Sequence, residues 1–544
     1  MSDVADRVIW LGPDEADEAV TPELVGSKAF GLWRMGKLGL RTPPAFALPT
    51  SLCAEVITNS GSAGERVAAL LRAGVERLEA TMGRQFGDAR APLLVSVRSG
   101  AAVSMPGMLA TVVNVGLGPQ TAHGLIRLSG DPRFAWDCTR RSVESYAVVV
   151  GGAPPVAFAR ALADMIRSEG VANESELDGE ALERLASRYV DIAAQHCARA
   201  VPQEPVDQLR EAALAVFRSW DCPKAREYRR LKGLEDLRGT AVTVQAMVFG
   251  NSGARSGSGV AFSRNPASGA KDLYVDFLFD AQGEDVVSGR RTPLGAESLS
   301  RRLPEAFADL ANGAALLERK FRDVQDVEFT IEDGRLFYLQ TRTAKRTPQA
   351  ALATAVDLVQ DGLIDPEEAL ARLSKVDLGR TGRTRFADQA EPLAFGTPAA
   401  PGVASGRAAF DSASAKRLAR DGEPVILLRA EPATEDIEGF EAAAGILTSA
   451  GGRTAHAAVV ARELGKVCVV GCAELRIDVD AGRAVLAQRP IAPGDWMSVD
   501  GESGAVSLGR RPIVAELPTA KLAEVAAWRA ARAGSPPEPA VHGA

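Results

Sequence analysis

At 544 residues the chain is too long to fold around a single hydrophobic core. Single cores stop growing at about 250–300 residues, so we expect roughly two to four domains. Hydrophobic residues make up 46% of the chain and charged residues 24%, which is typical of soluble globular proteins. The net charge of −7 and the lack of a basic stripe in the sequence argue against a nucleic-acid partner.

Neither the N-terminal sequence nor the cysteines indicate a secreted or membrane-bound protein. The first residues contain no basic segment followed by an apolar run, and no apolar stretch approaches the roughly 20 residues that cross a bilayer. The six cysteines are scattered along the chain, which fits buried thiols better than disulfides or a zinc site. We therefore expect a cytoplasmic protein without a membrane partner.

The pattern of apolar residues changes along the chain and predicts a multidomain α+β protein. Turns and apolar runs alternate in residues 1–345, interrupted by helical periodicity over about 125–235. A helical linker is expected at 346–389, followed by a strand- and glycine-rich domain at 390–512. Residues 513–544 are expected to form a C-terminal tail, with its end, SPPEPAVHGA, disordered.

Histidine is rare in this chain, and one of its four histidines lies in an unusual context. His456 follows an apolar strand (445–448), a Gly451-Gly452 turn and Thr454, and it precedes an Ala- and Val-rich helix. With Thr454 as N-cap, His456 falls in the first helical turn, where free N–H groups favour a phosphoryl group on the imidazole. The two glycines let the backbone approach a bulky phosphate. The alternative is a histidine that only caps or packs against the helix.

A short predicted hairpin, DVEFTIEDGRLFYLQTR, carries charged and polar side chains at alternating positions. Asp326 and Glu328 share one face of its first strand, and Gln340 and Arg342 share one face of the second, with Asp333-Gly334 at the turn. Two carboxylates beside an amide and a guanidinium can hold Mg²⁺ and a polyphosphate. The alternative is a solvated hairpin face with cross-strand ion pairs.

Two cations, Lys28 and Arg98, stand next to turns of small residues. Lys28 follows a Gly-Ser turn and precedes a helix, and Arg98 ends a predicted strand before a loop that can close over phosphates. Residues 31–37 nearly match a P-loop, but Leu38 replaces the Ser or Thr that holds Mg²⁺ and the stretch has a helical pattern, so we reject a P-loop. Taken alone, both cations fit surface charges better than phosphate ligands.

Taken together, these segments resemble the pyruvate, phosphate dikinase family. The resembling stretches follow the family's order and cover most of residues 24–505: VGSKAFGLWRMGKLGLRTPPAF, PLLVSVRSGAAVSMPGM, AVTVQAMVFGN, GVAFSRNPASG, DAQGEDVVSGRRTP, DVEFTIEDGRLFYLQTRTAKRT and GILTSAGGRTAHAAVVAREL. The resemblance implies an ATP-grasp nucleotide-binding domain at 1–345 and a swivelling phosphohistidine domain at 390–512.

The resemblance also implies roles for single residues. His456 is the expected catalytic nucleophile, and Thr454 matches a position where some family members are regulated by phosphorylation. The remaining expected site residues bind ATP and Mg²⁺, with Glu328 and Gln340 as metal ligands: Lys28, Arg98, Glu284, Asp326, Glu328, Gln340 and Arg342. In the family, the histidine takes the pyrophosphoryl group of ATP, passes the γ-phosphate to inorganic phosphate and keeps the β-phosphate, while AMP and pyrophosphate leave.

One departure from the family pattern concerns the phosphoryl acceptor. Family dikinases continue into a barrel that binds pyruvate or phosphoenolpyruvate, which needs roughly 200 residues or more, whereas this sequence ends at Ala544. We therefore expect a separate barrel protein as partner, with a second copy of the chain as a further candidate partner. Two alternatives stay open, namely a phosphotransferase to another acceptor and a non-catalytic nucleotide-binding regulator or phosphocarrier.

Overall fold

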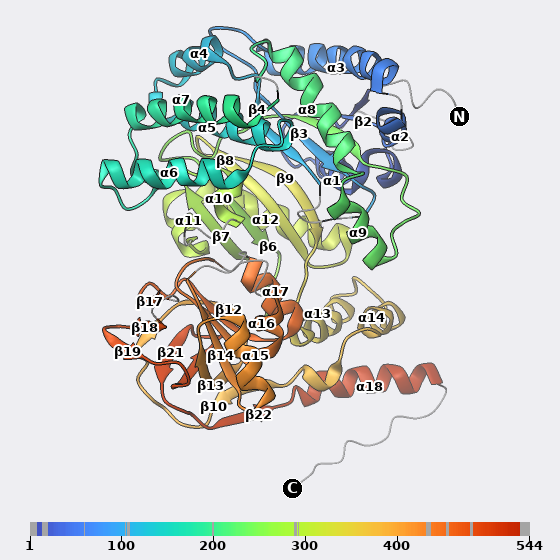
Figure 1. Cartoon of the computed structure of the whole chain (residues 1–544). Helices are drawn as coiled ribbons and strands as arrows, with labels where there is room; N and C mark the ends of the chain where they lie inside the picture. Colours follow the sequence, from blue (N-terminus) through green and yellow to red (C-terminus); the bar gives the residue numbers. More distant parts are fainter. Residues whose placement is uncertain are drawn as a thin grey trace. The chain divides into compact units, whose positions relative to one another are not determined.

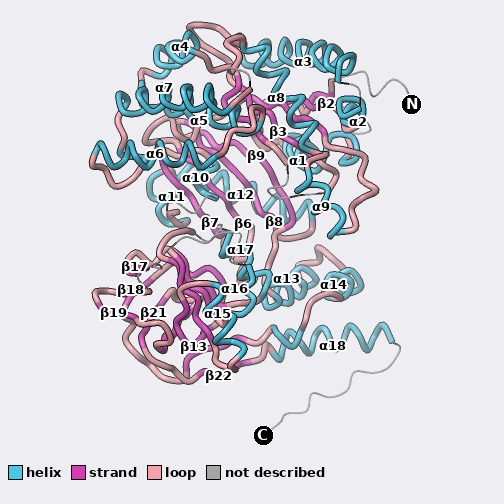
Figure 2. Tube along the Cα trace, viewed as in Figure 1, coloured by secondary structure: helices cyan, strands magenta, loops and turns pink. Residues whose placement is uncertain are grey.

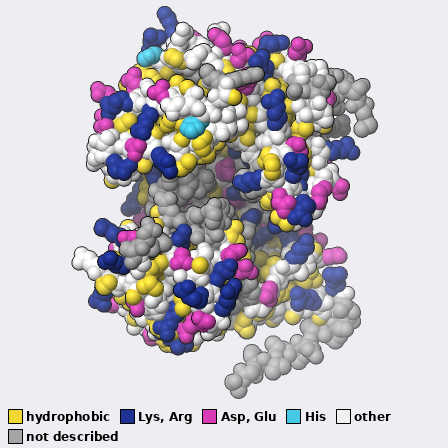
Figure 3. Space-filling model, viewed as in Figure 1, with side chains coloured by type: hydrophobic (Ala, Val, Ile, Leu, Met, Phe, Trp, Pro, Cys, Tyr) yellow, Lys and Arg dark blue, Asp and Glu magenta, His cyan; other side chains and the backbone are white. Residues whose placement is uncertain are grey.

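The computed structural model divides the chain into two compact units (Figure 1). The first unit contains residues 1–256 and 330–341, and the second contains residues 257–329 and 342–544. The structure describes residues 8–12, 20–58, 60–103, 105, 109–198, 201–287, 291, 293–430, 437–452, 456–478 and 482–533. Within these ranges, no helix is both long and apolar enough to cross a membrane. Cationic and anionic side chains are interspersed on the visible face of both units (Figure 3).

The first unit is built on a five-stranded antiparallel sheet (Figure 2). Its strands, in spatial order, are β1 (Ile9–Trp10), β2 (Ala45–Leu48), β5 (Ala241–Ala246), β3 (Val95–Gly100) and β4 (Thr111–Val115). Alternate valines of β3 and β5 join a hydrophobic core with residues of α2 (Ser51–Thr58), α3 (Ser60–Met82) and α8 (Pro205–Ser219). Because side chains alternate along a strand, the intervening residues of β3 and β5 point to the other face.

Helix α1 and a group of further helices complete the first unit. α1 (Pro22–Lys37) packs against β2, β3 and β5. The part of the sequence with helical periodicity contains α4 (Pro119–Ser129), α5 (Pro132–Val149), α6 (Pro155–Glu169), α7 (Gly179–His196), α8 and α9 (Pro223–Lys232). The long helices α5 and α7 pack together around a core of their own, which also includes residues of α6.

A four-stranded sheet contains the predicted hairpin. Its order is β7 (Tyr274–Phe279), β6 (Gly257–Phe262), β8 (Gln325–Glu332) and β9 (Arg335–Thr343). At the turn between β8 and β9, Asp333 and Gly334 have φ values of 46° and 77°. Positive φ at both central residues is the signature of a type I′ turn, so the predicted turn is confirmed. Three helices follow in sequence around this sheet: α10 (Gly283–Val287), α11 (Ala296–Arg302) and α12 (Pro304–Phe321).

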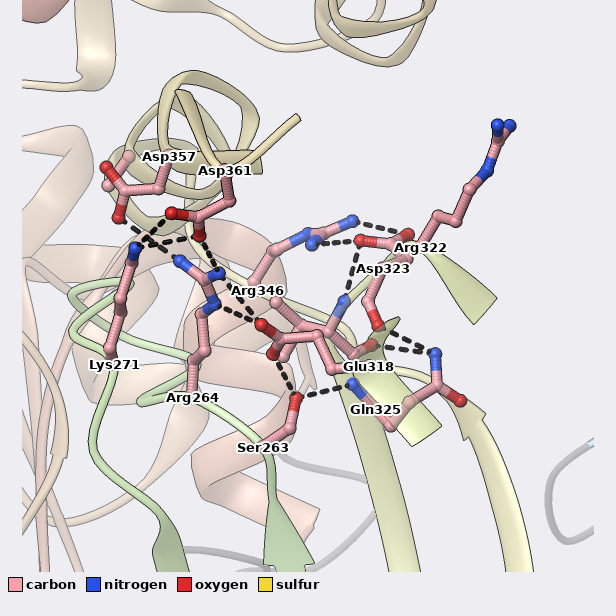
Figure 4. A network of polar contacts seen from close by, with 12 residues as sticks. Ser263, Arg264, Lys271, Glu318, Arg322, Asp323, Gln325, Arg346, Asp357 and Asp361 are labelled. Carbon is pink, nitrogen blue, oxygen red and sulfur yellow. Dashed lines mark hydrogen bonds and ion pairs between the residues drawn. The ribbon is translucent and has the colours of Figure 1, made fainter. Parts of the chain in front are cut away.

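Arg264 is the centre of an ion-pair network in the second unit (Figure 4). Its guanidinium lies 2.8 Å from Glu318 and 3.1 Å from Asp357, and the Arg264 side chain is only 3% exposed. Arg264 follows β6, Glu318 belongs to α12, and Asp357 belongs to α13 (Pro348–Gln360). The network therefore ties the helical linker to the four-stranded sheet.

We expect Arg264→Ala to lower the free energy of unfolding by about 3–5 kcal/mol, because half-buried carboxylates lose their buried cation. Urea denaturation of the whole chain measures this loss. The matched control is Lys271→Ala, which removes an ion pair of 2.7 Å to Asp361 from a side chain that is 55% exposed. An exposed pair contributes at most about 1 kcal/mol. Equal losses in the two variants would contradict the stabilising role of the network.

The C-terminal part of the second unit contains an eight-stranded sheet. Four parallel strands form its centre and alternate with helices: β13 (Val403–Ala409), α15 (Ser412–Arg420), β14 (Val425–Arg429), α16 (Ile437–Ala442), β15 (Gly445–Thr448), α17 (His456–Leu464) and β16 (Val467–Val470). Antiparallel strands flank them: β11 (Ala394–Phe395), β12 (Thr397–Ala400), β20 (Trp496–Asp500) and β21 (Ala505–Leu508). A small separate sheet consists of β17 (Leu475–Asp478), β18 (Arg483–Leu486) and β19 (Arg489–Ile491).

Residues 513–533, expected to be part of a tail, instead form ordered elements. β22 (Ile513–Glu516) pairs with β10 (Arg383–Phe386), and α18 (Thr519–Ala533) packs on α13 and α14 (Pro366–Leu373). The helix is anchored because its apolar residues, including the buried Val525, join the core of the linker helices. The disorder expected for SPPEPAVHGA falls outside the described residues. The domain boundaries expected at 345 and 389 stay predictions.

Candidate functional site

The elements that carry Lys28 and Arg98 meet in the first unit. Gly26, at a kink in α1, has a φ of 79°, and a Cβ atom at this position would lie 2.2 Å from the Gly100 carbonyl oxygen. The backbone N–H of Ser27 donates a 2.8 Å hydrogen bond to Ala101. The half-buried Lys28 therefore sits one residue beyond a backbone contact with the end of β3, the strand that contains Arg98. The helical rather than P-loop interpretation of residues 31–37 is confirmed.

We expect Gly26→Ala to destabilise the protein by at least about 3 kcal/mol, since it combines a positive φ with a clash against backbone. Gly39→Ala is the control, because Gly39 has the same φ of 79° but nothing within 4 Å of an added Cβ. Its cost is the conformational part alone, about 1–2 kcal/mol. Thermal denaturation distinguishes the two variants. Equal costs would contradict the close approach of α1 to β3.

Arg98 lies on a polar face of the five-stranded sheet. Its Nη1 donates a 3.3 Å hydrogen bond to Oε1 of Gln245 on β5. Gln245 and Thr243 alternate with the core valines of β5 and are almost fully buried. The Gln245 Nε2 and the Thr243 Oγ1 have no hydrogen-bond partner among the described residues. A buried polar group without a partner is costly, so these two atoms indicate a polar ligand next to Arg98.

The hairpin brings Asp326 and Arg342 together. The Arg342 Nε donates a 2.7 Å hydrogen bond to Asp326 Oδ2, while the Asp326 Oδ1 is buried without a partner in the described part of the chain. The Asp326 carboxylate is 8% exposed and the Arg342 side chain is 44% exposed. The cross-strand ion pair of the alternative interpretation is thus present, but the hairpin face is not simply solvated at Asp326. The Asp326 Oδ1 is a suitable ligand for a hard cation such as Mg²⁺.

Burial raises the pKa of the Asp326 carboxyl, and the neighbouring Glu328 adds to this shift. Arg342 and Arg462 oppose it without cancelling it. A carboxylate held in this way lacks a full set of compensating charges in the protein alone. Such a site favours binding of a further cation.

The other expected ligands occupy different environments. Gln340, on β9, is buried, and Glu328, on β8, is half-buried. Glu284 is exposed on the short helix α10, whereas the next residue, Asp285, is buried and accepts a 3.0 Å hydrogen bond from the Gln282 N–H. Lys28, Arg98 and Gln340 belong to the first unit, and Glu284, Asp326, Glu328 and Arg342 belong to the second. That all of them form one site stays a prediction.

His456 is the first residue of α17. The preceding strand β15 spans Gly445–Thr448, which agrees with the predicted strand. Gly451 has a φ of 102°, a conformation that favours glycine. The expected N-cap and regulatory residue Thr454 lies outside the described residues.

The segment before His456 contacts the four-stranded-sheet part of the same unit. A Cβ atom on Gly452 would lie 2.3 Å from Pro293 Cδ and 3.5 Å from Asp276 Oδ2. This contact requires glycine at position 452. The Tyr274 hydroxyl donates a 3.3 Å hydrogen bond to the Pro398 carbonyl across the same two parts.

Arg462, six residues after His456 along α17, lies at this contact. It is 2% exposed, and its Nη1 donates a 2.9 Å hydrogen bond to the Ala399 carbonyl. Burial lowers the pKa of the Arg462 guanidinium, and Tyr274, Asp276 and Asp326 oppose the shift. The helix that begins at His456 therefore places a cation close to the carboxylates of β7 and β8.

Four residues at these sites were missed by the sequence interpretation: Thr243, Gln245, Asp276 and Arg462. A sequence signal exists for the first three, because each is a polar residue within an otherwise apolar strand. Arg462 gives no such signal, since a basic residue in the last turn of a helix is ordinary.

Comparison with known proteins identifies two domains. Residues 64–297 match the model of the pyruvate phosphate dikinase AMP/ATP-binding domain, and residues 421–504 match the mobile domain of PEP-utilising enzymes. The chain thus contains a pyruvate phosphate dikinase AMP/ATP-binding domain and a mobile domain of PEP-utilising enzymes. Its mixed helix and sheet content agrees with an ATP-grasp domain followed by a phosphohistidine domain.

Three pyruvate, phosphate dikinases illustrate the similarity. The enzyme of Clostridium symbiosum is 42% identical over 505 residues, which are 92% of this chain and 58% of the relative. That of Rhizobium meliloti is 42% identical over 94% of this chain and 59% of the relative. Pyruvate, phosphate dikinase 2 of Zea mays is 42% identical over 90% of this chain and 56% of the relative. The chain thus spans somewhat more than half the length of these relatives.

The side chains present fit Mg²⁺ only as a site whose ligands come partly from the protein and partly from a bound phosphate group and water. Among the described residues, no three His, Cys, Asp or Glu side chains gather closely enough to hold a metal ion. Mg²⁺ is commonly bound by one or two carboxylates together with phosphate oxygens and water. The buried, partnerless Asp326 Oδ1 beside Glu328 fits such a shared site.

Proposed function

We propose that this chain transfers a phosphoryl group from ATP to His456. The imidazole attacks the β-phosphorus, and the bond between the β-phosphorus and the α,β-bridging oxygen breaks, so that AMP leaves. The imidazole proton passes to solvent. Inorganic phosphate then attacks the γ-phosphorus, pyrophosphate leaves, and the β-phosphate stays on His456. The observation that carries this proposal is the position of His456 at the start of α17, whose Arg462 lies near Asp326 of the hairpin.

The roles of the other residues follow from charge. Attack on a polyphosphate needs charge neutralisation more than covalent help, which Lys28, Arg98 and Arg342 supply. Glu328 and Gln340 hold Mg²⁺ with support from Asp326, and the ion, when bound, neutralises phosphate charge. Glu284 contributes to the nucleotide site, and its exposure on α10 leaves it accessible to a ligand.

The phosphoryl group on His456 then passes to pyruvate to give phosphoenolpyruvate. We propose that a pyruvate-binding barrel on a separate chain supplies the acceptor site, that the reaction takes place in the cytoplasm, and that a homodimer forms. Phosphorylation of Thr454 would regulate the step, because a phosphate two residues before His456 repels the incoming polyphosphate.

The test is the identity of the nucleotide product. Equimolar protein and ATP are mixed with Mg²⁺, with and without inorganic phosphate, and the nucleotides are separated by chromatography. AMP formed in an amount close to that of the protein supports the proposal. ADP as product contradicts transfer from the β-position, and bound but unchanged ATP supports a nucleotide-binding regulator instead.

A further inference from the structure

The polar face of the five-stranded sheet contains a Gln–Arg pair that the family comparison does not explain. In the antiparallel register, Arg98 lies opposite Thr243, and Ser96 lies opposite Gln245. Arg98 and Gln245 are therefore diagonal neighbours on one face, a separation that long side chains bridge. Their 3.3 Å hydrogen bond spans this diagonal.

The chemistry of Arg98 fixes the orientation of the Gln245 amide. A guanidinium carries only donors, so it must contact the amide oxygen of a glutamine. The Gln245 Nε2, a donor of two hydrogens, then points away from Arg98. It is buried without an acceptor among the described residues, in a side chain that is 3% exposed.

The residues opposite Gln245 and Thr243 on the neighbouring strand are small. The positions paired with Gln245 and Thr243 on β2 are Ala45 and Ala47, whose side chains are short. The Thr243 Oγ1 also lacks a partner in the described ranges. An unfilled donor, a hydroxyl and a cation thus share one face, and an anionic ligand with several acceptor oxygens satisfies all three.

On the basis of the proposed function, we propose that Gln245 donates through Nε2 to an oxygen of the ATP polyphosphate, with Thr243 as a second contact, while its Oε1 orients Arg98 for the same ligand. Gln245 is then both a binding residue and a positioning residue. The pair would select for ligands with phosphate groups rather than for the nucleoside.

Two substitutions at one position separate these roles. Gln245→Met removes both polar atoms, whereas Gln245→Glu keeps an acceptor for Arg98 and replaces the donor by a negative oxygen. We expect the dissociation constant of MgATP, measured by titration calorimetry, to rise at least about tenfold in Gln245→Met, because a hydrogen bond to a charged group is lost. The rise should be larger in Gln245→Glu. Wild-type affinity in Gln245→Glu would show that the residue only positions Arg98 and would overturn the phosphate contact.

The matched control is Gln208, which is buried to the same 3% but fully hydrogen-bonded. Its Nε2 donates 2.8 Å bonds to the carbonyls of Leu117 and Pro202, and its Oε1 accepts a 3.0 Å bond from Gly116. Without ligand, Gln208→Met should lower the melting temperature, and Gln245→Met should leave it unchanged or raise it. A matching decrease in Gln245→Met would mean that its Nε2 has a protein partner, which would overturn the inference.

Inorganic tripolyphosphate, as a competitor of ATP, tests the ligand class. If tripolyphosphate binds Gln245→Met more weakly than wild type, in parallel with ATP, the phosphate contact is supported. If tripolyphosphate competes equally well in both proteins, Gln245 contacts the nucleoside and the proposed phosphate contact is overturned. Unchanged ATP affinity in Gln245→Met would leave only an ordered water at Nε2, and a wild type that binds no ATP would overturn the inference as well. Because binding and not turnover is measured, the result for Gln245 holds whether or not His456 becomes phosphorylated.

Discussion

Replacement of His456 by alanine is expected to abolish AMP formation from ATP while ATP binding persists. The imidazole is the only side chain of the proposed mechanism that forms a bond to phosphorus, so no other proposed site residue can replace it. Loss of a catalytic nucleophile lowers a rate by on the order of 10⁶-fold in a well-studied hydrolase. The measurement is AMP formation in a single turnover, with ATP affinity measured on the same preparation.

His196→Ala is the matched control for this prediction. His196 is the exposed last residue of α7, and nothing in the proposed mechanism uses it. This variant should form AMP at the wild-type rate. Substantial AMP formation by His456→Ala would show that the phosphoryl acceptor is another group, and it would contradict the assignment of His456.

Asp326→Asn is expected to lower the rate of phosphorylation at least about 100-fold and to make the protein more stable at neutral pH. Activity falls because a carboxylate next to the polyphosphate and Mg²⁺ contributes electrostatic stabilisation of this order. Stability rises because the buried carboxylate is costly when charged, as the raised pKa of Asp326 indicates. Arg342 keeps solvent access after the substitution and loses little.

The pH dependence of stability tests the direction in which folding shifts the pKa of Asp326. With a folded-state pKa above the ordinary value of 3.8, the stabilising contribution of Asp326 is fully present below that value. It is lost as the pH rises through the folded-state pKa. The stability advantage of Asp326→Asn should therefore be largest at neutral pH, shrink as the pH falls through the folded-state pKa, and reach its minimum below the ordinary value of 3.8. A constant difference across this range would contradict a raised pKa.

Asp323→Asn is a control that should change stability in the opposite direction from Asp326→Asn. The Asp323 carboxylate accepts hydrogen bonds of 2.6 and 2.9 Å from Arg346, and both side chains are largely buried. Its substitution should lower stability and leave phosphorylation near the wild-type rate, since Asp323 is not among the proposed site residues. Denaturant titration and AMP formation, measured together, distinguish the two aspartates.

Local patterns were sufficient to predict the elements on which the candidate site stands. The Asp333-Gly334 turn and the strand at 445–448 depend on a few neighbouring residues, and the structure has both. The start of α17 at His456 likewise follows from a local change of pattern after two glycines.

Long-range contacts could not be read from the sequence in the same way. The burial of Gln245 depends on strands far apart in the chain, and the contact of Gly452 with Pro293 depends on the packing of two parts of the second unit. The residues of α18 were assigned to a tail because their apolar surface becomes buried only by packing on α13 and α14. The proposed roles of Lys28 and Arg98 rest on the family resemblance, because their local sequence alone did not favour them.

The most direct test of phosphoryl transfer to His456 follows two labels in parallel. Wild-type protein is incubated with Mg²⁺, phosphate and ATP carrying ³²P in either the β- or the γ-position. The proposed chemistry predicts an acid-labile, alkali-stable protein label from the β-position, while the γ-label leaves in pyrophosphate. Protein label from the γ-position alone, or no label despite ATP binding, would contradict it.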